Sequence, residues 1–154
     1  MSKQIDLVPC YSDRALFLRL YRDYVDTLHE FDNTIVWDEI SASQYMWSAF
    51  FILEDRTLQG FVITEEVCYK LYSDLLYLAE FYIVPEARRQ GVGLAAVRAI
   101  TGKWHGDVFL YILNHNFAAK GFWGAVEREL GWKQIDRPEI RREKGCELYI
   151  YSNS

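Results

Sequence analysis

Cysteine and histidine are scarce in this chain, and their scarcity argues against two kinds of stabilising site. The cysteines, Cys10, Cys68 and Cys146, stand far apart, without a Cys-x-x-Cys pair or a cluster of histidines. This spacing predicts neither a disulfide framework nor a structural zinc site, and no metal ligands are expected. We expect free thiols in a reducing cytoplasm.

Long apolar runs and a surplus of positive charge are also missing. No uninterrupted apolar run approaches the roughly 18 residues that a membrane span requires, and residues 1–6 lack the apolar core of a signal peptide. The net charge is −5, whereas proteins that bind nucleic acid non-specifically are normally basic. We therefore expect a cytoplasmic protein with neither a membrane nor a nucleic acid as its partner.

Material for a hydrophobic core is plentiful. Hydrophobic residues make up 51% of the 154 residues, aromatic residues 16% and charged residues 25%, a balance typical of a folded chain. No internal repeat, linker or low-complexity segment divides the sequence. Length and composition therefore predict a single domain over residues 1–154.

Apolar periodicity predicts strands that alternate with helices. Strands are expected at 4–9, 50–53, 60–64, 75–84, 108–113, 132–136 and 147–151. Helices are expected after Ser12 or Asp13, at 41–49, at 94–102, and from Asn114 or Asn116 to Glu129. Residues 67–73 are ambiguous between the end of a strand and a loop.

Residues 75–100 read as a buried strand, a loop with two glycines and a helix, an arrangement that binds phosphate groups. The first N–H groups of a helix lack intrahelical partners, and the helix dipole favours an anion there. Gly91 and Gly93 carry no side chain, so a ligand can approach the backbone closely. The loop is therefore the first candidate for a binding site.

Two common phosphate-binding patterns fit this loop poorly. A Walker-type loop needs Lys and then Ser or Thr after its last glycine, but Leu94 and Ala95 follow here. Gly91, Gly93 and Ala96 satisfy a dinucleotide-binding fingerprint formally. That fingerprint also needs an acidic residue about 20 positions further on, and residues 111–116 contain none.

Two segments resemble the GNAT acetyltransferase superfamily. Residues 88–93, Arg-Arg-Gln-Gly-Val-Gly, resemble its Arg/Gln-x-x-Gly-x-Gly/Ala loop. Residues 116–132 resemble its later Asn-x-x-Ala-x-x-Phe-Tyr…Leu-Gly-Phe segment, and the resemblance covers about residues 75–132 in all. It implies an α/β (α+β) GNAT fold, with a mixed, mostly antiparallel sheet of about 6–7 strands flanked by about four helices.

The resemblance further implies an N-acetyltransferase that moves an acetyl group from acetyl-coenzyme A to a primary amine. In the family the loop amides bind the pyrophosphate and the preceding strand pairs with the pantetheine arm. The residues so implied for coenzyme A are Phe81, Tyr82, Ile83, Arg88, Arg89, Gln90, Gly91, Val92, Gly93, Leu94, Asn116 and Trp123. For the two arginines the alternative is solvated charge, and for Asn116 it is a plain helix N-cap.

Glu80 is the candidate general base, because it is the charged residue inside an otherwise apolar strand and burial would raise its pKa. The alternative is a carboxylate that only satisfies backbone donors. The family commonly has a tyrosine where this chain has Trp123, and an indole N–H is not a useful acid. Tyr82, Tyr111, Tyr149 or water could protonate the thiolate instead, with Trp123 packed on the sulfur end of the cofactor.

The candidate residues for the acceptor amine are Asp26, His29 and Trp37, through charge and cation–π contact. The alternative is an ordinary solvated face. We expect a small-molecule amine as acceptor, and the resemblance adds a homodimer as an expectation. Two other functions stay open: a non-catalytic regulatory module that binds coenzyme A, which Trp123 favours, and a protein or peptide N-acetyltransferase.

The loop interpretation predicts the effect of Gly93→Asp. A carboxylate and a Cβ placed against the pyrophosphate should abolish binding of coenzyme A with only a modest loss of fold stability. A thermal-shift titration with acetyl-coenzyme A measures both, because a ligand that binds only the folded state raises the melting temperature. NADH and ATP serve as control ligands, and a variant that still binds acetyl-coenzyme A would show that the loop is misread.

Overall fold

The computed structural model describes residues 3–69 and 72–153. The chain divides into two compact units. The first consists of Met1–Ile63 and Glu80–Ile100, and the second of Thr64–Ala79 and Thr101–Ser154. The long strands β3 (Thr57–Tyr69) and β4 (Tyr72–Ile83) contribute residues to both units. The expectation of a single domain stays a prediction.

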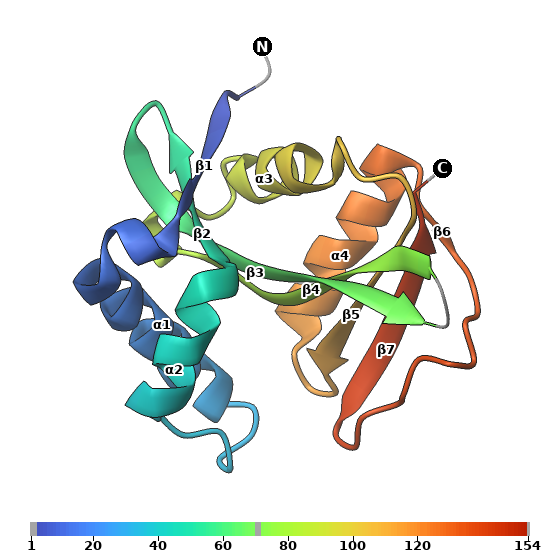
Figure 1. Cartoon of the computed structure of the whole chain (residues 1–154), viewed down its shortest axis with the longest axis horizontal. Coiled ribbons are helices and arrows are strands. Elements are labelled where there is room, and N and C mark those ends of the chain that lie inside the picture. Colours follow the sequence, from blue (N-terminus) through green and yellow to red (C-terminus); the bar gives the residue numbers. More distant parts are fainter. Residues whose placement is uncertain (1–2, 70–71, 154) are drawn as a thin grey trace. The chain divides into compact units, whose positions relative to one another are not determined.

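The described part of the chain forms a seven-stranded sheet and four α-helices (Figure 1), as the resemblance implies. The sheet order is β1-β2-β3-β4-β5-β7-β6. The described pairings are antiparallel except that of β4 with β5, which is parallel. The other strands are β1 (Ile5–Pro9), β2 (Ala49–Glu54), β5 (Asp107–Leu113), β6 (Lys133–Gln134) and β7 (Cys146–Ser152). The helices are α1 (Arg14–His29), α2 (Glu39–Tyr45), α3 (Val92–Thr101) and α4 (Phe117–Leu130).

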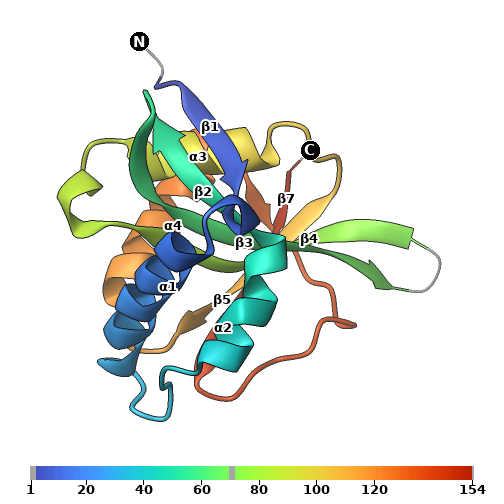
Figure 2. The same ribbon diagram turned by 60° about the vertical axis from the view of Figure 1, so that its left-hand side comes forward.

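Helix α1 covers one face of the first unit's strands. Asp13 caps it by accepting a hydrogen bond from the Leu16 N–H at 3.2 Å. Its buried residues follow helical spacing, and the ring of Phe17 lies edge-on to Phe61 of β3 at 5.6 Å. Helix α2 runs beside α1 (Figure 2), where the Arg14 guanidinium donates to the Ser43 hydroxyl at 3.0 Å. The buried residues of α1 are Phe17, Leu20, Tyr21 and Val25.

Helix α3 packs on the opposite face of the same strands. Successive residues of a strand point to opposite sides of the sheet. Phe61 meets α1, whereas the next residue, Val62, packs with Ile52 of β2 and Ala96 of α3. The first unit thus has two apolar layers that share one set of strands.

The second helix and the second strand of the hairpin differ from the prediction by several residues, and local turn chemistry sets where both of them start. The second helix was expected at 41–49, but Asp38 caps it through the Ile40 N–H at 3.2 Å, so α2 starts at Glu39 and ends before β2. The hairpin turn needs only Asp55 and Arg56, both at positive φ, which is typical of a two-residue turn. Strand β3 therefore starts at Thr57. At its other end it continues into the ambiguous segment 67–73, of which residues 70–71 lie outside the described residues.

The second unit is built around β5. On one face Leu75, Phe109 and Ile150 form a buried cluster with Ile140 from the loop between β6 and β7. Helix α4 ends at Leu130 and is capped by Gly131, whose left-handed φ of 68° is usual for a glycine in this place. The expected closing strand pair is present, although β6 is only two residues long.

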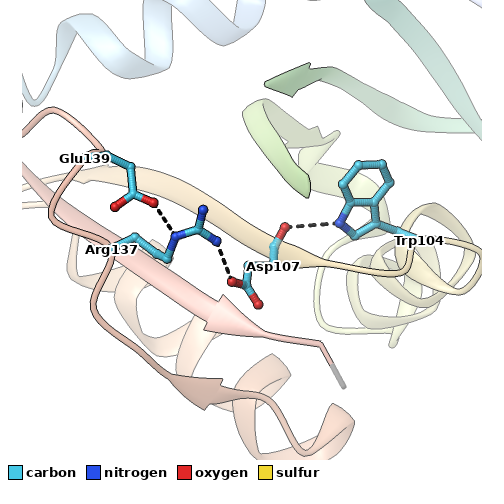
Figure 3. Close-up of polar contacts among 4 residues, drawn as sticks. All are labelled: Trp104, Asp107, Arg137 and Glu139. Carbon is cyan, nitrogen blue, oxygen red and sulfur yellow. Dashed lines mark hydrogen bonds and ion pairs between the residues drawn. The ribbon is translucent and has the colours of Figure 1, made fainter. Parts of the chain in front are cut away.

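A polar network anchors the loop between β6 and β7 (Figure 3). The Arg137 guanidinium donates to the Asp107 carboxylate at 2.8 Å and also pairs with Glu139. The indole N–H of Trp104 donates to the backbone carbonyl of Asp107 at 3.0 Å. The side chains of Arg137 and Asp107 are only 21% and 24% exposed, so their charges are partly removed from water and depend on each other.

Replacing Arg137 by alanine should lower the free energy of unfolding by about 1–3 kcal/mol, because the half-buried Asp107 carboxylate loses its partner. Urea unfolding measures the change. Arg142→Ala, an exposed arginine in the same loop, is the matched control and should change stability by less than about 0.5 kcal/mol. Equal stability of the two variants would show that the network does not hold the loop.

Candidate active site

Side-chain alternation along β4 places Glu80 and Tyr82 on the face that α1 covers. The ring centroid of Tyr82 lies 5.5 Å from that of Tyr24 in α1, and the Tyr24 hydroxyl donates a hydrogen bond to the Glu80 carboxylate. Phe81 and Ile83 point the other way and join the apolar cluster with α3. One strand thus carries a carboxyl group and a phenol toward α1 while its opposite face packs in the core.

The carboxyl group of Glu80 is half-buried among aromatic rings. Burial raises the pKa of Glu80 from 4.5 to about 7, although the hydrogen bond from Tyr24 acts in the opposite direction. The direction agrees with the sequence-based expectation, and the role of Glu80 as a base stays a prediction. A carboxyl group with such a pKa exchanges a proton readily near neutral pH.

The rings around Glu80 form a continuous aromatic cluster. Phe61 lies 5.8 Å from both Tyr21 and Tyr82, and 5.5 Å from Tyr24, between ring centroids. Burial raises the pKa of Tyr21 most, and the negative charge of Glu80 raises it further. Tyr21, Phe61 and Tyr82 are at most 8% exposed, so this cluster shields Glu80 from water and accounts for its raised pKa.

Strands β3 and β4 approach closely at Gly60. A Cβ at this position would lie 1.8 Å from the carbonyl oxygen of Tyr82, a distance that no real contact reaches. The Val84 N–H donates to the Gln59 carbonyl at 2.8 Å just beside it. Gly60 therefore lets the end of β4 lie against β3, and with it the backbone that carries Tyr82.

The loop after β4 leads directly into α3. The chain makes a short turn at Pro85–Ala87, and Arg89 and Gly91 then have φ angles of 60° and 79°. The Ala95 N–H donates to the Gly91 carbonyl at 3.1 Å, the first bond of α3. The amides of Val92, Gly93 and Leu94 therefore precede the helical ladder and can serve a ligand. A left-handed residue such as Arg89 is uncommon, and successive backbone amides in such turns form anion-binding concavities.

Arg88 is tied to the end of β4. Its Nε donates to the Ile83 carbonyl at 2.9 Å, and its guanidinium lies 5.6 Å from the ring centroid of Tyr82. Gln90 donates to the Glu86 carbonyl at 3.1 Å. Both side chains brace the loop, and a direct role of Arg88 or of the exposed Arg89 toward phosphate stays a prediction.

The candidate acceptor residues lie on α1 and the loop that follows it. Asp26 is exposed, His29 places Nδ1 2.8 Å from the Ile35 carbonyl oxygen, and Trp37 is half-buried with the Arg22 guanidinium 5.5 Å from its ring. Their neighbour Asp38 is occupied with capping α2. Asp26 and His29 are both exposed, so of the three only the Trp37 ring is partly covered.

Asn116 and Trp123 belong to the second unit. The Asn116 side chain caps α4 by accepting from the Ala119 N–H at 3.1 Å, as its alternative interpretation proposed. Trp123 is buried in α4, with its ring edge-on to Phe122 at 5.0 Å. The hydroxyls of Tyr111 and Tyr149 donate to the Arg141 carbonyl and to Glu147. The roles toward coenzyme A given to these residues stay predictions.

Within residues 3–69 and 72–153, no group of His, Cys, Asp or Glu side chains is arranged to hold a metal ion. In the same part of the chain, no helix is both long and apolar enough to cross a membrane.

The sequence profile of the acetyltransferase (GNAT) family matches residues 15–131. The chain belongs to this family. As a member of this family, the protein is an N-acetyltransferase that depends on acetyl-coenzyme A. No curated protein matches the sequence significantly.

Solved structures show the same fold at low sequence identity. An acetyltransferase from Thermus thermophilus aligns with a TM-score of 0.70 at 15% identity over 97% of this chain and 98% of that one. Diaminobutyrate acetyltransferase from Paenibacillus lautus, in complex with its substrate and coenzyme A, aligns with a TM-score of 0.69 at 12% identity over 99% and 96%. An aminoglycoside acetyltransferase from an uncultured soil sample, in complex with sisomicin, aligns with a TM-score of 0.57 at 16% identity over 91% and 96%.

Sequence reasoning missed two residues of the GNAT acetyltransferase's candidate site. Tyr24 belongs to an apolar stripe of α1 and gave no sign of a polar role, because its partner Glu80 is 56 residues away. Gly60 looked like an ordinary strand residue, although an isolated glycine inside a strand pattern is a known sign of close backbone approach.

Gly60→Ala should lower the free energy of unfolding by about 2 kcal/mol or more, because β3 and β4 must separate at Tyr82. Chemical denaturation of the protein without ligand measures the loss. Gly121→Ala in α4 is the matched control, since a Cβ there meets nothing within 4 Å, and it should stabilise the protein by about 0.5–1 kcal/mol. A Gly60→Ala protein as stable as the wild type would contradict the close approach.

Proposed function

We propose that this enzyme acetylates a primary amine of a small molecule by direct attack on the thioester, with Glu80 as the general base. The observation that carries the proposal is a carboxyl group with a pKa of about 7 on the α1 face of β4. It lies in the same unit as a loop whose helix-start amides suit a pyrophosphate. A base and a cofactor anchor are the two parts that acetyl transfer needs first.

The loop residues fit coenzyme A. The amides of Val92, Gly93 and Leu94 precede the helical ladder, and the positive φ angles of Arg89 and Gly91 make the backbone concave there. When bound, acetyl-coenzyme A supplies the acetyl group as a thioester and departs as the free thiol. The backbone of Phe81–Ile83 is the proposed partner of its pantetheine arm.

Glu80 performs the first proton transfer. The acceptor amine is mostly an ammonium ion at neutral pH, and the Glu80 carboxylate takes one proton from it. The freed lone pair then forms the new C–N bond as the C–S bond breaks. The nitrogen loses a second proton as the amide forms, which balances the proton that the sulfur gains.

Tyr82 is the proposed donor of the proton to sulfur, and the second proton that the nitrogen loses restores its phenol. Burial raises the pKa of Tyr82 and Arg88 lowers it, with Asp23 and Glu86 raising it further. The phenol therefore keeps its proton at neutral pH and can donate it. Trp123 has no proton to give at this pH, so we propose a packing role for its indole.

A small acceptor is supported by the structural neighbours whose complexes hold L-2,4-diaminobutyric acid and sisomicin. In this chain Asp26 and Trp37 are the proposed contacts for its charged amine, with His29 beside them through its second ring nitrogen. A peptide acceptor is the alternative, and an acceptor screen decides between the two.

Glu80→Gln should lower kcat/KM at pH 7 by about 10²–10⁴-fold, the usual contribution of a general base. Release of free thiol from acetyl-coenzyme A, with diamines, amino acids, aminoglycosides and peptides as acceptors, measures the rate. In the wild type, kcat/KM should rise with pH through about 7, because the ionised carboxyl group is the active form.

The thermal shift with acetyl-coenzyme A separates loss of catalysis from loss of binding. Glu80→Gln should keep this shift, and Glu66→Gln, an exposed residue of β3, should keep both shift and rate. If Glu80→Gln keeps the wild-type kcat/KM, Glu80 is not the general base. If the enzyme acetylates only peptides, the proposal of a small-molecule acceptor is wrong and a peptide acceptor replaces it.

A further inference from the structure

The hydroxyl of Tyr24 reaches the proposed base from a different element of the first unit. Tyr24 lies on α1, and its hydroxyl donates a hydrogen bond to Oε2 of Glu80 on β4. Its ring is fixed by packing, edge-on to Phe61 at 5.5 Å and tilted against Tyr82 at 5.5 Å. Because the ring packs against Tyr21, Phe61 and Tyr82, the position of the hydroxyl is set by the aromatic cluster.

We propose that Tyr24 is a positioning residue for Glu80, holding one carboxylate oxygen so that the other is left to take the proton of the acceptor amine. This inference rests on the proposed role of Glu80 as the base. The phenol of Tyr24 serves as a hydrogen-bond donor, and the proton of the acceptor amine passes to Glu80.

The hydrogen bond also keeps the base usable at neutral pH. Burial favours the neutral carboxylic acid, and the bond from Tyr24 favours the carboxylate. Without the hydroxyl, desolvation would act alone and Glu80 would hold its proton to a higher pH. The base would then be largely protonated under conditions in which the wild type is half ionised.

Among residues 3–69 and 72–153, the other groups that act on this cluster do not replace the Tyr24 hydroxyl. Tyr21, also on α1, is affected by the charge of Glu80 and stays neutral because its pKa is raised. Phe61 of β3 carries no charge. Tyr82 on the same strand is influenced by Arg88, Asp23 and Glu86, the charged groups that act on its pKa. Tyr24 is therefore the group whose removal should move the titration of Glu80.

Tyr24→Phe tests the inference, because it removes the hydroxyl and keeps the packed ring. The acid limb of the kcat/KM profile should move up by about one pH unit, the effect expected for one hydrogen bond to a charged group. The loss should be about tenfold at pH 6.5 and less than about threefold at pH 9. A loss of equal size at every pH would indicate a merely structural role and overturn the inference.

Tyr45→Phe is the matched control. Tyr45 belongs to the same aromatic cluster, with its ring 5.8 Å from that of Tyr21, and it is 43% exposed. Its loss should leave the acid limb in place. A limb that moves equally in both variants would show that any phenol of the cluster has the effect, and would overturn a specific role for Tyr24.

Direct titration of the carboxyl group separates this inference from the proposed function. Carbon-13 NMR of labelled glutamate, with Glu80→Gln identifying the resonance, reports the pKa of Glu80 without turnover. An unchanged pKa in Tyr24→Phe overturns the positioning role even if Glu80→Gln is inactive. Full activity of Glu80→Gln overturns the role of Glu80 as the base. The inference about Tyr24 then fails as well, even if the pKa of Glu80 moves in Tyr24→Phe.

A fluorotyrosine at position 24 keeps the test usable if Tyr24→Phe folds poorly. Fluorine makes the phenol more acidic and so a stronger donor to the carboxylate. The acid limb should then move to lower pH, opposite to the shift in Tyr24→Phe. A limb that stays in place with the fluorinated residue would overturn the inference.

Discussion

The two-residue period of β4 is the constraint on which the candidate site depends. A strand must send alternate side chains to opposite faces, so Glu80 and Tyr82 share the α1 face whereas Phe81 and Ile83 enter the core beside α3. A slip of one residue would turn the carboxylate toward α3 and the side chains of Phe81 and Ile83 toward α1. The close approach of β3 at Gly60 fits this register, because it brings the two backbones together at Tyr82.

Within that register, the chemistry of Glu80 is decided by two opposing effects. Desolvation by the surrounding rings disfavours the charged carboxylate, and the Tyr24 hydroxyl favours it. Desolvation is the larger effect, since the pKa settles at about 7, well above its usual value. With desolvation alone, Glu80 would stay protonated at neutral pH. Without desolvation, its pKa would stay near the usual value and the carboxylate would be a weak base.

The parts of the fold that follow from neighbouring residues were predictable, and those that depend on distant contacts were not. The phosphate loop was recognisable because Arg88, Gly91 and Gly93 fall within six residues, and the structure starts α3 there. Helix α2 was misplaced because a single Asp38 cap outweighs a weak apolar pattern. Strand β3 was underestimated because its far end is rich in polar residues.

The same distinction holds for the site. Glu80 stood out as a charge in an apolar strand, a feature that the sequence alone displays. Its partner Tyr24 did not, because tyrosine on an apolar helical stripe is normally core packing and nothing local records which strand it will face. The acceptor residues Asp26, His29 and Trp37 come from a segment whose composition, rather than any spacing, suggested them, so their part in the reaction stays open to the acceptor screen.

The raised pKa of Glu80 also couples the stability of the fold to pH. The folded protein binds this proton more tightly than the unfolded chain, in which the group titrates near its ordinary value of 4.5. The stabilisation is complete below that value and is lost as the pH rises toward about 7, where the folded group ionises. If Glu80 is the base, as proposed, the pH range in which it ionises for catalysis is also the range in which its contribution to the stability of the fold is lost.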